Sequence, residues 1–153
     1  MFLKKKFTTY KSFAGQSIES VLSKNMIDKA KVLEVNELKS GYLANDDGQF
    51  KFMPFKNILQ VAPITSFLKY DFNKNGSNSI LLGGNYFGLT PYHGRLDAFS
   101  GALINDINSI NLGPKIGLNF LKKEIRHLSI IKMDKKPYLM VTTNNNKVEI
   151  YKF

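Results

Sequence analysis

The chain has 153 residues, 43% of them hydrophobic, which suits a single domain with one core. It contains no cysteine, which excludes a disulfide framework and any metal site built from thiolates. The formal net charge is +10, yet only Arg95 and Arg126 among the 22 basic residues are arginine.

This lysine-rich balance favours a generally solvated basic surface over a dedicated nucleic-acid site. Arginine has the planar fork that suits phosphates and guanine edges, and it is scarce here. The alternative stays open that the chain is a small basic β-protein that binds nucleic acid or another polyanion. One continuous basic groove lined by exposed aromatic side chains would favour that alternative.

Residues 1–40 are expected to form a helical cap or linker and a lead-in strand. Ser17 suits the N-cap of a helix over residues 17–32, which Asn25 is expected to interrupt. The start of the chain is basic, but residues 7–24 lack the apolar segment of an export signal. No run of about eighteen uncharged apolar residues is present, so we predict no transmembrane helix.

From residue 41 onwards, short alternating segments separated by turn residues predict antiparallel sheets. Asp47-Gly48 is a strong hairpin signal, and residues 134–137 predict another turn. Residues 67–72 resemble residues 128–134, which indicates a repeat with a period of about 60 residues. The expected strands are residues 42–44, 49–53, 64–70, 78–83, 99–104, 109–112, 127–133, 138–143 and 147–153.

The segment from Asp71 to Ser79 reads D-F-N-K-N-G-S-N-S and is a candidate Ca²⁺ loop. Oxygen-bearing side chains recur along it, and Gly76 allows the sharp turn that such a loop needs. The twelfth position is Leu82 instead of the bidentate Glu of an EF-hand, which excludes that motif. The alternative is an Asx-rich turn that hydrogen-bonds its own backbone. The candidate ligands are Asp71, Asn73, Asn75, Ser77 and Ser79.

A strand, this loop, a second strand and then Gly83-Gly84-Asn85 together resemble the FG-GAP or VCBS repeat of integrin-alpha-like β-propellers. The hairpin sequence N-D-D-G-Q-F at residues 45–50, Q-V-A-P-I at 60–64 and G-R-L-D-A at 94–98 extend the resemblance. It covers about residues 40–153 and is similar to the last repeats of large secreted bacterial proteins, often beside an ASPIC/UnbV segment.

The resemblance implies a mainly β fold of antiparallel, four-stranded, blade-like sheets. It places the final strands of one blade at residues 41–60, a full blade at 61–113 and a degenerate blade at 125–153. A propeller closes with at least about four blades, so this chain would not close a ring alone. The family's loop carries more aspartates than this one, which implies that Ca²⁺ binding is weak or lost.

The resemblance also implies a non-catalytic binding or scaffold module. Its partners would be neighbouring blades of a longer chain, or a protein or glycan. The implied location is extracellular or at the cell surface, for which an export signal would have to precede Met1. Without such a signal, a cytoplasmic location stays open.

The uncharged region after the loop holds the remaining candidates. Arg95 and Asp97 are expected to organise the long loop over residues 84–92, by contact with each other or with loop carbonyls. A hydrolase-like base at His93 with Asp97 lacks an identifiable nucleophile, so we do not expect an enzyme. His127 is expected to be partly buried. A ligand surface would be formed by Tyr86, Phe87 and Tyr92 if they are exposed.

Overall fold

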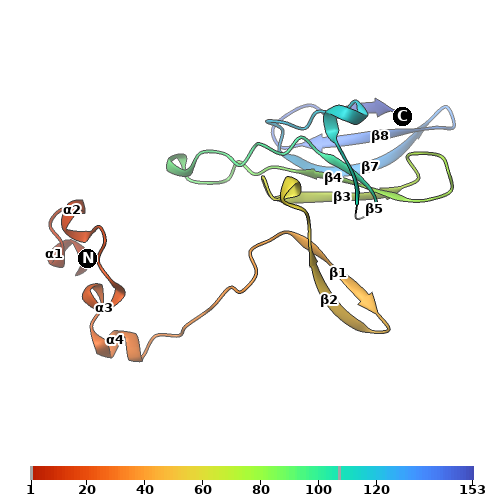
Figure 1. The fold of residues 1–153 in the computed structure, drawn as a ribbon. Coiled ribbons are helices and arrows are strands. Elements are labelled where there is room, and N and C mark those ends of the chain that lie inside the picture. The colour runs from red at the N-terminus through yellow and green to blue at the C-terminus, as the bar shows by residue number, and fades with distance from the viewer. Residues whose placement is uncertain (1, 107) are drawn as a thin grey trace. The chain divides into compact units, whose positions relative to one another are not determined.

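The computed structural model describes residues 2–106 and 108–153. The chain divides into two compact units, Met1–Leu38 and Lys39–Phe153. Within the described residues, no helix combines the length and the apolar composition needed to cross a membrane. The second unit is mainly β, with antiparallel sheets of two, four and three strands (Figure 1).

The first unit contains short helices, and the helix expected over residues 17–32 is wrong in extent. Ser17 caps a helix as predicted, because its side chain accepts a hydrogen bond from the backbone N–H of Ser20. Leu22 is extended and Ser23 starts a new cap, so the interruption falls there and not at Asn25. The helices are α1 (Phe2–Lys6), α2 (Tyr10–Phe13), α3 (Ile18–Val21) and α4 (Lys24–Asp28).

Residues 30–38, where the sequence predicts a lead-in strand, form neither helix nor strand. No strand of the described sheets pairs with this segment, and a strand needs a neighbour for its backbone groups. The apolar side chains of the segment are highly exposed, as Leu38 shows with 87% exposure.

The second unit begins with the predicted hairpin of β1 (Gly41–Asp46) and β2 (Gln49–Pro54). Asp46 pairs with Gln49, so the loop has two residues, and both have positive φ. This is the geometry of a type I′ turn, which the Asp-Gly pair favours. The base of the hairpin is held by Gln60, whose side chain exchanges hydrogen bonds of 2.8 and 2.9 Å with the backbone of Ser40.

The next four strands form an antiparallel sheet in chain order, β3-β4-β5-β6. The expectation that residue 99 begins a strand is wrong, because the backbone N–H of Phe99 bonds to a side chain and Gly101 has positive φ. The other three strands lie within a residue of their expected places. The bounds are β3 (Ile64–Tyr70), β4 (Ser79–Gly84), β5 (Ala102–Asp106) and β6 (Ser109–Leu112).

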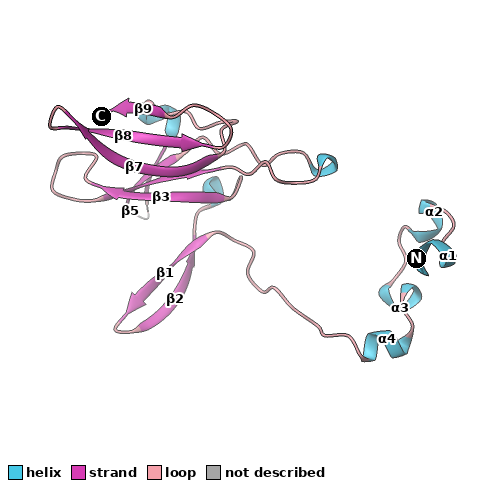
Figure 2. Cartoon of the chain, turned by 180° about the vertical axis from the view of Figure 1, so that it is seen from behind, coloured by secondary structure: helices cyan, strands magenta, loops and turns pink. Residues whose placement is uncertain are grey.

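The last sheet contains β7 (Ile125–Met133), β8 (Lys136–Thr143) and β9 (Glu149–Lys152). The turn between β7 and β8 is formed by Asp134 and Lys135, both with positive φ. Strands β3 and β4 contact β7, so the two larger sheets lie face to face, as Figures 1 and 2 show.

Apolar side chains cover both faces of the four-stranded sheet, because neighbouring residues of a strand point to opposite sides. Leu81 faces the three-stranded sheet, whereas Leu82 faces the segment that contains Leu59. The buried residues between the sheets are Leu81, Leu103, Leu118, Phe120, Ile125, Leu128, Leu139 and Val141. The described sheets do not close into a ring, so the assignment to propeller blades stays a proposal.

Candidate functional site

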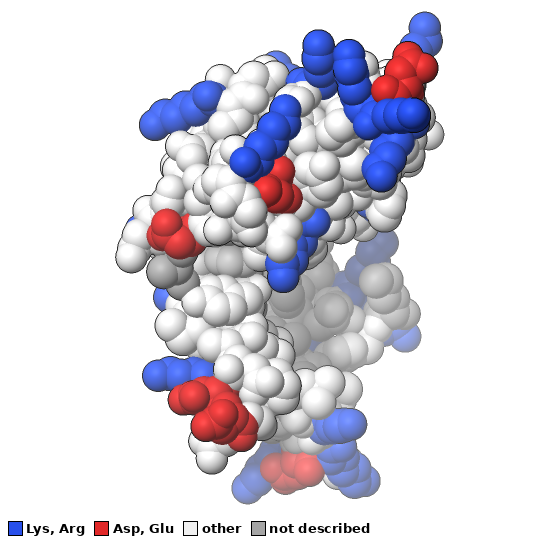
Figure 3. Space-filling view, turned by 90° about the vertical axis from the view of Figure 1, so that its right-hand side faces the viewer, with Lys and Arg blue, Asp and Glu red and all other residues white. Residues whose placement is uncertain are grey.

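Figure 3 shows how charged side chains are distributed on one face of the protein. On the face drawn in Figure 3, Lys and Arg are interspersed with Asp and Glu and separated by wide uncharged areas. The face drawn in Figure 3 lacks the continuous basic groove that a polyanion site would present.

His127 is exposed and not partly buried as expected, because β7 has a register shift between residues 125 and 127.

The predicted Ca²⁺ loop connects β3 to β4 and is held by its own hydrogen bonds. The two carboxylate oxygens of Asp71 accept from the backbone N–H groups of Asn75 and Gly76, at 3.1 and 2.8 Å. Gly76 has a φ of +81°, as the sharp turn requires. The side-chain oxygen of Asn75 accepts from the backbone of Ser77 at 2.9 Å. The carboxylate thus serves an Asx-rich turn.

Two other candidate ligands point to the neighbouring strand β5. The Asn73 amide donates to Asn105 Oδ1 at 3.1 Å, and the Ser79 hydroxyl donates to the same oxygen at 2.7 Å. Ser79 is 2% exposed. Among the described residues, no group of three or more His, Cys, Asp or Glu side chains is placed to hold a metal ion. Ca²⁺ binding by this loop stays a prediction.

The long loop after β4 is closed by two backbone hydrogen bonds between Tyr86 and Leu96, of 2.9 and 3.0 Å. His93 Nδ1 lies 2.7 Å from the Thr90 hydroxyl. No ion pair joins His93 or Arg95 to Asp97 in the part of the chain that the structure describes.

Arg95 stacks on an aromatic ring of its own loop instead of pairing with Asp97. Its guanidinium carbon lies 4.8 Å from the centre of the Phe87 ring, a cation–π geometry. The guanidinium makes no hydrogen bond to any described residue. Among the aromatic candidates, Tyr86 is 37% exposed, Phe87 is half-buried and Tyr92 is 98% exposed.

Arg95, Tyr86 and Phe87 border a pocket of about 480 Å³, which we call the Arg95 pocket, whereas Tyr92 does not line it. The pocket has three walls. They are formed by residues 86–88 with Arg95, by residues 122–124 with Arg126, and by residues 143–146 at the end of β8 and just after it. The aromatic side chains of the first wall are recognisable in the sequence, whereas no sequence signal indicates the other two walls, which lie far along the chain.

The buried carboxylate of Glu124 connects these walls through its hydrogen bonds and an ion pair. Its side chain is 1% exposed, and its carboxylate contacts Arg126 at 2.9 Å and accepts from the Asn144 amide at 2.8 Å. The backbone N–H of Phe87 lies 3.4 Å from the same carboxylate. A buried carboxylate needs such partners, because water no longer solvates it. Glu124 therefore ties all three walls together.

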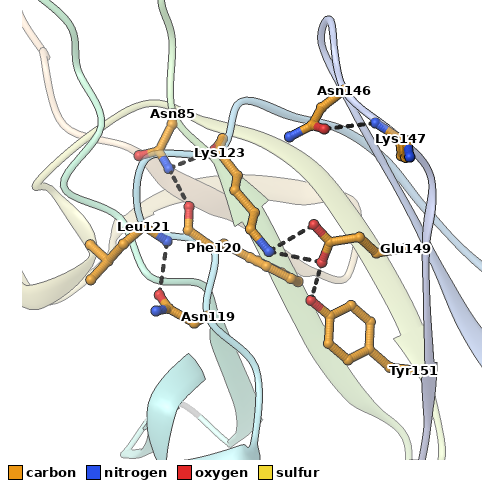
Figure 4. Close-up of polar contacts among 9 residues, drawn as sticks. All are labelled: Asn85, Asn119, Phe120, Leu121, Lys123, Asn146, Lys147, Glu149 and Tyr151. Atoms are coloured by element: carbon orange, nitrogen blue, oxygen red, sulfur yellow. Dashed lines mark hydrogen bonds and ion pairs between the residues drawn. The ribbon is translucent and has the colours of Figure 1, made fainter.

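Lys123, at the edge of the pocket, pairs with Glu149 of β9 (Figure 4). Its Nζ atom lies 2.7 and 2.8 Å from the two carboxylate oxygens, and the Tyr151 hydroxyl donates to the same carboxylate. Burial disfavours the charged forms of Lys123 and Glu149. Their mutual hydrogen bond and charge outweigh it, so the pKa of Lys123 is raised and the pKa of Glu149 is lowered. Burial and the Glu149 carboxylate raise the pKa of Tyr151.

Asn85, at the end of the G-G-N motif, is fully buried and holds the start of the long loop. Its amide donates to the carbonyl oxygens of Phe99, Phe120 and Lys123, at 2.8 to 2.9 Å. Two of these contacts are drawn in Figure 4. The motif carried the resemblance, but nothing in the sequence indicated that its asparagine joins three separate segments.

A second hollow, of about 360 Å³, lies between the hairpin and the four-stranded sheet. We call it the apolar groove. Phe67 and Ile80 line it from the sheet and are 56% and 39% exposed, while Tyr42 and Phe55 line it from the hairpin side. The face of the sheet opposite the three-stranded sheet is therefore only partly covered.

Comparison with protein-family models, with curated proteins and with solved structures finds no match for the chain.

Proposed function

We propose that the chain is a non-catalytic scaffold and binding module of the FG-GAP/VCBS type, whose four-stranded sheet receives a further antiparallel sheet. The observation that carries this proposal is the apolar groove, where Phe67 and Ile80 remain exposed on a sheet face that also contributes core residues such as Leu82. Blades of a propeller are four-stranded sheets that pack face to face. Here one face of the β3–β6 sheet already packs on β7–β9.

The hairpin indicates what kind of partner the groove fits. A two-stranded hairpin is marginally stable alone, and β1 and β2 each have one edge without a paired strand in the described sheets. Strands added at such an edge would extend the hairpin into a sheet and cover the groove. The proposed occupant is therefore a β-sheet with an apolar face, supplied by neighbouring blades or by another copy of the chain.

The proposal is tested by light scattering of the isolated chain across micromolar to millimolar concentrations, with ANS fluorescence on the same samples. We expect the chain either to self-associate through the groove or to remain a monomer that binds ANS. Phe67→Lys should abolish the self-association in the first case and the ANS binding in the second. Val148→Lys is the matched control, because Val148 is 54% exposed and lies outside the groove. A wild-type monomer that binds no ANS would contradict the proposal.

A further inference from the structure

We infer that the Arg95 pocket binds a small molecule that joins an oxyanion, a carboxylate or phosphate, to a ring. The pocket of about 480 Å³ has the size of small-molecule sites in proteins. It is built entirely from the second unit and lies apart from the apolar groove. The inference therefore stands independently of the sheet-packing proposal.

The charge of the lining favours an anion. Four cationic side chains line the pocket against the carboxylate of Glu124, and Glu149 neutralises Lys123 from outside the lining, which leaves two positive charges in excess. Glu124 is buried and already bonded to Arg126 and Asn144. Lys123 is paired with Glu149. These pairings fix the walls and leave the charge of Arg95 and Lys122 available for a ligand.

Arg95 is the residue best placed to hold the oxyanion. Its guanidinium has no acceptor among the described residues, and the nitrogen fork of arginine matches the two oxygens of a carboxylate or phosphate. The stack on Phe87 holds the guanidinium before any ligand arrives, which lowers the entropy cost of binding. The side chain of Lys122 makes no ion pair or hydrogen bond with described residues and adds a second charge from the second wall.

The other lining groups suit a ring with hydroxyl groups. Tyr86 offers a partly exposed aromatic side chain against which the apolar face of a ring can pack. Thr143 lines the pocket with a buried hydroxyl that has no hydrogen-bond partner in the described residues. The amides of residues 144–146 add donors and acceptors. Sugar acids and sugar phosphates share this chemistry.

The test uses the whole chain and four probes, glucuronate, glucose 6-phosphate, neutral glucose and inorganic phosphate, with binding measured by isothermal titration and by NMR shift perturbation. We expect the two anionic sugars to bind, with shifts at Tyr86 and Arg95, and neutral glucose to bind at least about tenfold more weakly. Comparing the affinity for glucuronate with the affinity for glucose 6-phosphate shows whether the pocket prefers a carboxylate or a phosphate.

Three variants separate a binding role from a structural one. Arg95→Ala should weaken binding of the anionic sugars about tenfold or more, and Arg95→Lys should weaken it less because it keeps the charge. Lys132→Ala, which removes an exposed lysine outside the pocket, should leave binding unchanged. Circular dichroism and thermal melts confirm that each variant is folded.

Three results would overturn the inference. The first is that neither anionic sugar binds at millimolar concentrations. The second is equal affinity of wild type and Arg95→Ala. If inorganic phosphate binds as tightly as glucose 6-phosphate, the pocket recognises an anion without its ring, and the assigned ligand class is wrong.

Discussion

The side chain of Asn85 satisfies both backbone polar groups of Phe99. Its Oδ1 accepts from the Phe99 N–H and its Nδ2 donates to the Phe99 carbonyl, each at 2.9 Å. Asn85 has a φ of 80°, so the backbone turns away from β4 at this residue, and the Asn85 side chain bonds across the loop. A buried asparagine thus replaces the strand pairing that Phe99 would otherwise need.

We predict that Asn85→Ala lowers the free energy of unfolding by about 3 kcal/mol, because it removes the side-chain partner of backbone groups at Phe99, Phe120 and Lys123. Asn85→Gly should be similar in effect, since glycine tolerates the positive φ but restores no hydrogen bond. Asn119→Ala, at an exposed asparagine, is the control. Urea unfolding measures all three, and near-native stability of the glycine variant would show that backbone strain dominates.

A second prediction concerns Gly83 of β4, which packs against Ile125 of β7. A Cβ atom on Gly83 would lie 2.6 Å from Ile125 Cγ2, closer than real contacts allow. Gly83→Ala should therefore cost about 1–3 kcal/mol by overpacking the core. In an Ile125→Ala background the cost should shrink, because the obstructing atoms are gone. Equal costs in both backgrounds would show that the contact with Ile125 is not the source of the cost.

A third prediction follows from the shifted pKa values around Glu149. The lowered pKa of Glu149 contributes stability that is present above its unfolded value near 4.5 and lost as the pH falls. The raised pKa values of Lys123 and Tyr151 contribute stability that is present below their unfolded values, 10.5 and 10.0, and lost as the pH rises.

Glu149→Gln should therefore cost about 1 kcal/mol near neutral pH. The difference from wild type should diminish below about pH 4.5 and above about pH 10. Urea unfolding between pH 3 and pH 11 measures this difference, with Glu34→Gln in the other unit as the control. A penalty that stays constant with pH would mean that Glu149 contributes by packing and not by charge.

Much of the strand pattern could be predicted because its signals are local. Asp47-Gly48 fixes a two-residue hairpin through its own backbone preferences, and Ser17 caps its helix through a hydrogen bond three residues away. The expected break at Asn25 failed because Ser23, two residues earlier, is the stronger cap. Both signals are local, and the hydrogen bond that the Ser23 side chain accepts from the Met26 N–H sets the helix start.

The candidate site depended on contacts between distant segments. Lys123 and Glu149 are 26 residues apart, and nothing in either neighbourhood indicates that they meet. Glu124 lies in the charged run K-K-E-I-R, which is typical of a solvated surface, although the structure buries it. Arg95 stands out in the sequence by its isolation in an uncharged region, but the expected partners were Asp97 or loop carbonyls, and Phe87 is found instead.

The last prediction concerns the Asp71 loop, in which one carboxylate already serves the turn. We expect about 10 mM Ca²⁺ to leave the wild-type melting temperature unchanged and to stabilise Asn73→Asp/Asn75→Asp by about 1.4 kcal/mol, the value for a site of about 1 mM affinity. The added carboxylates raise the charge of the loop, on which Ca²⁺ affinity depends. Ser79 is left unchanged because it is buried against Asn105. Adding Asp71→Asn should remove the effect, and sodium chloride of equal ionic strength should not reproduce it. A double variant indifferent to Ca²⁺ would show that the loop is only a turn.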